Sequence, residues 1–276
     1  MSLVSSVLLG LIQGIAEFLP ISSSGHLAIA EHLLGVSAEI PEFFDVLLHL
    51  GTLVAVFAAY FGDIVDMILE LFAGISDLIH RKTPVPVPPA RRLILLIVVA
   101  TLPLFAVLPL QDRIESMSGN IYFVAVALLL TGCLLFISDR FRRGRKTVRN
   151  ALVSDALLVG VAQAFATCPG LSRSGTTIAA GCFAGFERKF AVRFSFLMSI
   201  PAVLGANILS LADAAKAGII WEEVPVYLAG VAVAAITGYI CISLLRMIAE
   251  RGRFGWFAYY CWGIGIVTLA VSAIMG

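Results

Sequence analysis

The sequence predicts an all-α integral membrane protein, and its composition, its long apolar segments and an internal repeat carry that prediction. Of 276 residues, 60% are hydrophobic and 13% are charged, and the mean hydropathy is +0.99. A soluble domain carries about 25% charged residues. A chain this apolar is typical of multi-pass membrane proteins. The formal net charge of +1 gives no indication of a nucleic-acid partner.

Six segments are long and apolar enough to form transmembrane helices, which need about 20 residues. They are residues 43–60, 93–110, 121–137, 190–211, 224–248 and 254–275. Two other apolar stretches, residues 2–35 and 151–185, are interrupted in the middle by proline, glycine and serine. Proline removes a backbone donor and glycine favours a break, so no helix is expected to run through these points. Each stretch is therefore predicted to form a re-entrant helical hairpin, which enters and leaves the membrane on one side.

The two interrupted stretches match each other at a constant offset of 150 residues. The matching pairs are Gly10 and Gly160, Gln13 and Gln163, Ala16 and Ala166, Ser22 and Ser172, Ser24 and Ser174, Gly25 and Gly175, Phe44 and Phe194, and Leu47 and Leu197. We interpret this as a duplication within one membrane domain, residues 1–276, with repeat one covering about 1–140 and repeat two about 150–276. Each repeat contributes three spans, an odd number, so the second repeat is expected to be inverted relative to the first.

The basic residues predict the orientation of this arrangement. Sixteen of the 19 Lys and Arg residues fall on one side, against Arg113 and Lys216 on the other. The positive-inside rule makes the basic side cytoplasmic. Both termini and the mouth of the first hairpin then face outward. An acidic amphipathic stretch that contains Asp63 and Asp77 follows the first span and is expected to form a surface helix.

Three charged or titratable residues lie inside or beside the hairpin breaks: Glu17, His26 and Arg173. Because such groups are costly in a membrane, they are functional candidates by default. Gln13 lies one helical turn before Glu17, so both side chains share a face. The helix N-termini expected near Gly25 and Gly175 would present free N–H groups to an anion such as phosphate.

These residue types suit phosphate chemistry on a lipid. The Arg173 guanidinium can hold two phosphate oxygens. Ser23 and His26 supply a nucleophile and a proton acceptor. The side-chain oxygens of Glu17 and Gln13 could bind a divalent cation such as Mg²⁺ or Ca²⁺.

Structural roles remain open for the same residues. Glu17 and Arg173 could form a buried ion pair that joins the repeats, and His26 could be a satisfied buried histidine. The serines could cap the returning helices. Asp45 and His49, at the start of the first span, could also reach the site.

Three sequence motifs resemble those of a known family. They are Gln13-x-x-x-Glu17, the segment Phe18-Leu-Pro-Ile-Ser-Ser-Ser-Gly-His26, and the segment Pro169-Gly-Leu-Ser-Arg-Ser-Gly-Thr-Thr177. In this order and spacing they resemble the signatures of the bacterial undecaprenyl-diphosphate phosphatases, also called bacitracin-resistance proteins. Length and hydropathy agree over the whole chain. Gln13 stands where many members have glutamate, which lowers the charge available to a metal.

The resemblance implies an enzyme of the bacterial inner membrane that removes the terminal phosphate of undecaprenyl diphosphate and so recycles the cell-wall lipid carrier. Ser23 would be the nucleophile, with Arg173 holding the phosphates and Glu17 assisting. His26 would be the general base or acid, and a phosphohistidine route stays open. The hydroxyls expected to line the phosphate site are Ser22, Ser24, Ser172, Ser174 and Thr177.

The predicted partners are the diphosphate lipid and the surrounding membrane lipid, and a homodimer is left open. The site is expected to open to the periplasm. The alternative function is a polyprenyl-lipid flippase or anion transporter with the same inverted-repeat architecture. A carrier would need the arginine and the helix ends but no nucleophile.

Overall fold

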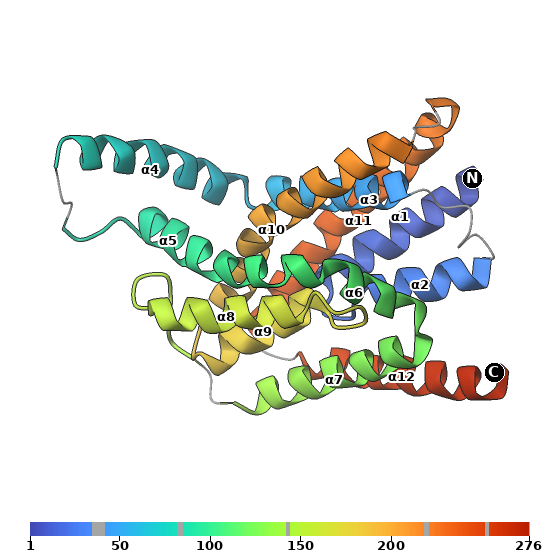
Figure 1. The fold of residues 1–276 in the computed structure, drawn as a ribbon. Helices are drawn as coiled ribbons and strands as arrows, with labels where there is room; N and C mark the ends of the chain where they lie inside the picture. Colours follow the sequence, from blue (N-terminus) through green and yellow to red (C-terminus); the bar gives the residue numbers. More distant parts are fainter. Residues whose placement is uncertain (35–41, 82–84, 142–143, 218–220, 252–253, 276) are drawn as a thin grey trace.

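The chain folds into a bundle of helices (Figure 1), shown by a computed structural model that describes residues 1–34, 42–81, 85–141, 144–217, 221–251 and 254–275. The α-helices are α1 (Leu3–Phe18), α2 (Ser23–Leu34), α3 (Glu42–Ala59), α4 (Phe61–Ile79), α5 (Pro89–Thr101), α6 (Gln111–Ser116), α7 (Ile121–Arg140), α8 (Val153–Phe165), α9 (Arg173–Phe183), α10 (Arg188–Ala217), α11 (Val224–Arg251) and α12 (Gly255–Met275). Short 3-10 helices extend α5 and precede α7 and α11. Within the described ranges, β structure is limited to one isolated bridge between Lys146 and Phe186.

Within the described ranges, five helical segments are long and apolar enough to cross a membrane. They are Pro89–Leu110, Ile121–Arg140, Arg188–Ile208, Trp221–Arg251 and Gly255–Ile274. A sixth candidate is α3 together with α4, which are bent by 82° at the break between them. Five of the six predicted spans coincide with the five segments, and residues 43–60 coincide with α3, which is long and apolar enough only together with α4. The chain is a multi-pass membrane protein.

Helix α4 is the acidic amphipathic stretch that the sequence placed after the first span. Figure 1 shows it projecting from the bundle beyond α3. None of its residues is buried. Its acids pair with arginines on neighbouring helices: Asp63 with Arg193, and both Glu70 and Asp77 with Arg91. Among the described residues they are not part of any group of three or more His, Cys, Asp or Glu residues suited to a metal.

Both interrupted stretches break where proline, glycine and serine occur. Helices α1 and α2 lie side by side as one hairpin, and α8 and α9 form a second (Figure 1). The returning helices begin at Ser23 and Arg173, two residues earlier than the glycines at which we placed their N-termini. The reason is capping: the Ser22 and Ser172 hydroxyls accept hydrogen bonds from the backbone N–H groups of Gly25 and Gly175.

The first arm of each hairpin packs against a helix from the other half of the chain. Gly10 of α1 faces Gly230 of α11 so closely that a Cβ at Gly10 would overlap the Gly230 carbonyl oxygen. Gly160 of α8 faces Ala100 of α5 in the same manner. Small residues allow such close approach of helix backbones in membranes. These contacts join the two halves of the chain and place both hairpins between helices of the bundle.

Candidate active site

The tips of the two hairpins contact each other. The Gly170 N–H donates a 3.3 Å hydrogen bond to the Ser24 hydroxyl, and the Ser174 hydroxyl donates one of 3.4 Å to the Leu19 carbonyl. The first turn contains Ser22 in the left-handed region, with φ of 75°, and the second contains Gly170 with φ of 87°. A serine in this conformation is strained, whereas a glycine is not. The two breaks, 150 residues apart in sequence, therefore form one polar site with unequal halves.

Glu17, in the last turn of α1, is the centre of this site. Its carboxylate forms an ion pair with the Arg173 guanidinium through Oε1. Its other oxygen, Oε2, accepts a 2.6 Å hydrogen bond from the Ser23 hydroxyl and a 3.2 Å bond from the Gln13 amide. The Glu17 side chain is 7% exposed and that of Arg173 is 25% exposed. The carboxylate is thus buried, paired and in contact with the hydroxyl that the sequence indicated as the nucleophile.

His26 bonds to Ser22 and Tyr260. Its Nδ1 lies 2.8 Å from the Ser22 carbonyl oxygen and its Nε2 lies 2.8 Å from the Tyr260 hydroxyl. A carbonyl can only accept, so Nδ1 carries the hydrogen, and in the neutral ring Nε2 accepts from Tyr260. The two rings also stack, with centroids 5.6 Å apart and an interplanar angle of 10°. Both ring nitrogens are therefore engaged, and the structure does not pair His26 with Ser23.

Four of the five hydroxyls predicted to line the phosphate site are buried, and one is exposed. Ser22 and Ser172 are buried and cap their helices. Thr177 is also buried and is bonded to the Arg173 carbonyl and the Ser195 hydroxyl. The remaining two differ in exposure, because Ser174 is buried whereas Ser24 is exposed at the surface of the tip.

The site contains oxygen atoms that could bind a cation, but too few protein ligands to hold a metal ion by themselves. No group of three or more His, Cys, Asp or Glu residues suited to a metal occurs in the described part of the chain. The Gln13 Oε1 atom is buried beside the Glu17 carboxylate, and it has no hydrogen-bond partner in the described part of the chain. One carboxylate and one free amide oxygen fit a cation that arrives with the phosphate oxygens of a substrate, which is how Mg²⁺ is often held.

Tyr260 is the site residue that sequence reasoning missed. It lies on α12, 234 residues from His26. A tyrosine in an apolar span resembles the aromatic residues found at membrane interfaces, so no motif distinguished it. His49, one of the two residues expected to reach the site, lies within electrostatic range of Glu17, and its Nδ1 bonds to the Asp45 carbonyl.

Comparison with known proteins agrees with these motifs over the full chain. Residues 6–267 match the family of the bacitracin resistance protein BacA. Proteins named undecaprenyl-diphosphatase include one from Methanosphaera stadtmanae that is 40% identical, with 100% of both chains covered. The counterpart from Methanobrevibacter smithii is 40% identical over 99% of this chain and 98% of its own. The one from Syntrophotalea carbinolica is 41% identical over 99% of this chain and all of its own. The chain described here therefore belongs to the bacitracin resistance protein BacA family.

Proposed function

We propose that this protein is an undecaprenyl-diphosphate phosphatase, which hydrolyses undecaprenyl diphosphate to undecaprenyl phosphate and inorganic phosphate. The observation that carries the proposal is the buried contact of Glu17 with both Ser23 and Arg173. It puts a hydroxyl, a carboxylate base and a guanidinium at one point, next to two helix N-termini. A carrier would need no hydroxyl held against a base, so the contact favours hydrolysis over transport.

Ser23 attacks the terminal phosphorus in this mechanism. The Ser23 hydroxyl gives its proton to Glu17 Oε2, the Oγ–P bond forms, and the bond between the terminal phosphorus and the bridging oxygen breaks. Undecaprenyl phosphate leaves, and water then hydrolyses the phosphoserine to release phosphate. Arg173 exchanges its contact with Glu17 for the phosphate oxygens and stabilises the charge that spreads over them in the transition state.

Gln13 and Glu17 would hold a divalent cation that enters with the diphosphate. Such a cation would neutralise charge on the phosphate oxygens. Gln13 also donates to Glu17 Oε2 and thereby orients the carboxylate toward Ser23. His26, held by Ser22 and Tyr260, is placed to exchange a proton with the leaving group or with water.

The hairpin lengths support a re-entrant arrangement with six spans. Helices α1 and α8 have 16 and 13 residues. At 1.5 Å per residue they are roughly 24 Å and 20 Å long, shorter than the hydrocarbon core of about 30 Å. Each hairpin thus ends inside the membrane, where its tip meets the other. We propose two inverted repeats with the mouth of the first hairpin open to the periplasm, as the distribution of basic residues favours.

The decisive experiment is phosphate release from farnesyl or undecaprenyl diphosphate by the purified chain in detergent. The Ser23→Ala and Arg173→Ala variants are expected to lose activity by at least about a thousandfold, the order of loss when a nucleophile is removed. Ser138→Ala is the matched control, because that buried hydroxyl bonds only to its own helix backbone at Leu135. Full activity in Ser23→Ala would instead assign the attack to His26 or water, and no release from the parent chain would favour transport.

The orientation is tested by cysteine labelling at the tip. Ser24→Cys is the suitable position, because Ser24 is exposed whereas Gly25 is buried. Cys133 and Cys168, the native cysteines with surface exposure, are first replaced by serine. We expect a membrane-impermeant maleimide to label Ser24→Cys in intact cells. Labelling that requires access from the cytoplasm would contradict the periplasmic opening.

A further inference from the structure

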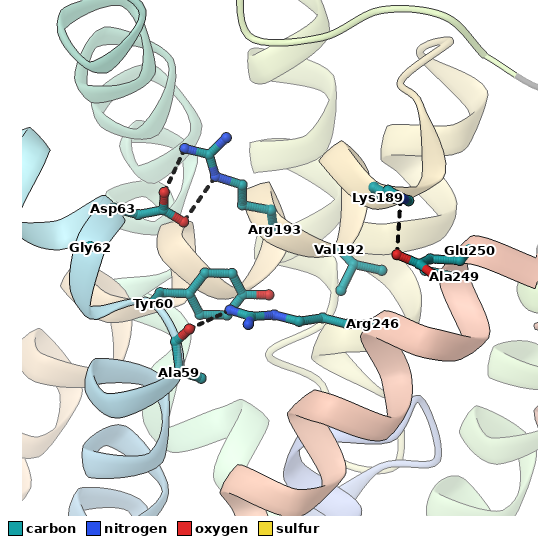
Figure 2. Close-up of a pocket in the computed structure, with 10 residues that line it drawn as sticks. All are labelled: Ala59, Tyr60, Gly62, Asp63, Lys189, Val192, Arg193, Arg246, Ala249 and Glu250. Carbon is teal, nitrogen blue, oxygen red and sulfur yellow. Dashed lines mark hydrogen bonds and ion pairs between the residues drawn. The ribbon is translucent and has the colours of Figure 1, made fainter.

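A cavity of about 450 Å³ lies away from the hairpin tips, beside the bend between α3 and α4 (Figure 2). Helices α10 and α11 close its other sides. Its charged lining residues are Lys189, Arg193, Arg246, Asp63 and Glu250. Three cations therefore face two carboxylates, and the cavity has an excess of positive charge at the basic end of the molecule.

Two of the cations are paired with acids at the rim. Arg193 makes a bidentate contact with Asp63, at 2.8 and 3.0 Å. Lys189 lies 2.9 Å from Glu250, and both of those side chains are more than half exposed. Exposed ion pairs contribute little free energy, so an entering anion can replace a carboxylate partner.

The third cation, Arg246, has no carboxylate partner in the ranges that the structure describes. Arg246 stacks on the Tyr60 ring, with its Cζ 3.9 Å from the ring centroid, and donates to the Ala59 carbonyl. In Figure 2 the Tyr60 hydroxyl points past this guanidinium toward Val192. That hydroxyl is buried and interacts with the Arg246 guanidinium, which can only donate, so the hydroxyl hydrogen has no acceptor among the described residues. The cavity thus combines a pre-positioned guanidinium with a hydroxyl that is free to donate, and both groups can bind an anion.

We propose that this cavity binds a phosphate group through Arg246, with Lys189 and Arg193 as further donors. Its position between spans at the basic end fits the phosphate of an anionic phospholipid headgroup, because basic pockets of this kind take anionic lipids. Inorganic phosphate offers the same chemistry to the same donors. The proposal is independent of the reaction assigned to the hairpin tips.

Binding is measured on the full chain in detergent with two radiolabelled probes, a short-chain phosphatidylglycerol and inorganic phosphate. Arg246→Gln should weaken binding about tenfold, the effect of losing a charged hydrogen bond. Asp63→Asn should tighten it, because the substitution frees Arg193 from its competing carboxylate. Misfolding cannot produce that gain, so the pair of variants separates loss of the site from loss of the fold.

Two controls define the site. Arg140→Gln removes a cation that also stacks on a ring, that of Phe136, but lies outside the cavity. Arg173→Gln removes the phosphate-binding guanidinium of the hairpin tips, so the binding that this variant loses is assigned to the tips and subtracted. The remaining binding, which depends on the cavity, should be the same in the parent, Arg140→Gln and Arg173→Gln. Cavity-dependent binding of phosphatidylglycerol alone identifies a lipid headgroup as the ligand, and binding of phosphate identifies the free ion. The proposal would be overturned if the parent, Arg246→Gln and Asp63→Asn had equal dissociation constants for both probes. It would also be overturned if Arg140→Gln weakened binding as much as Arg246→Gln does.

Discussion

The ion pair between Glu17 and Arg173 can be tested for structural and catalytic roles in one double-mutant cycle. Arg173→Gln leaves the Glu17 carboxylate buried with only two neutral donors, Ser23 and Gln13. Breaking a buried pair costs about 3–5 kcal/mol. The Arg173 side chain is 25% exposed and the two donors remain, so the lower limit of about 3 kcal/mol applies here. Glu17→Gln should destabilise the fold by a similar amount, because it leaves the guanidinium without its anion.

The double variant, Glu17→Gln with Arg173→Gln, should recover most of that stability because no unpaired charge remains. Phosphate release should stay lost in all three variants, because the base and the phosphate-binding guanidinium are both needed. The free energy of unfolding is measured by denaturant titration in mixed micelles, alongside activity. Stability losses that add to within about 0.5 kcal/mol would show that the two residues are not coupled, and the reasoning would fail. Activity restored with stability would make the pair purely structural.

Three further predictions concern packing, positioning and a buried amide. Gly10→Ala should destabilise the fold by about 1–3 kcal/mol, because its Cβ meets a carbonyl of α11 that cannot move aside. Gly62→Ala, where nothing lies within 4 Å, is the control and should cost nothing in thermal unfolding. Tyr260→Phe should lower kcat about fivefold with KM little changed, because it removes one hydrogen bond to His26; an unchanged kcat would remove Tyr260 from the mechanism. Gln163→Leu should stabilise the fold by about 1 kcal/mol, because both polar atoms of this buried amide lack partners among the described residues. A loss of stability in the denaturant titration would contradict this and would reveal a partner such as bound water.

The contact between Glu17 and Ser23 shows where prediction from sequence stopped. The motifs indicated both residues, and the Gln13 to Glu17 spacing placed two side chains on one helix face. Sequence could not choose the base for Ser23, because that choice depends on side-chain orientation at a turn. The structure places Glu17, not His26, against the hydroxyl. His26 is directed to Tyr260, a residue of the other repeat that carries no motif.

The sequence by itself determined the membrane class, the five or six apolar spans and the two helix breaks, because hydropathy and the backbone limits of proline and glycine are local properties. It also predicts that the two breaks are related, since the residues around them match at a constant offset of 150. Only the tertiary structure decided that each hairpin packs against a helix from the other half of the chain, that α4 turns away from α3, and that a basic cavity forms at their bend. The packing of the hairpins depends on how closely Gly10 and Gly160 let distant helices approach, and contacts between distant segments leave no local periodicity in the sequence.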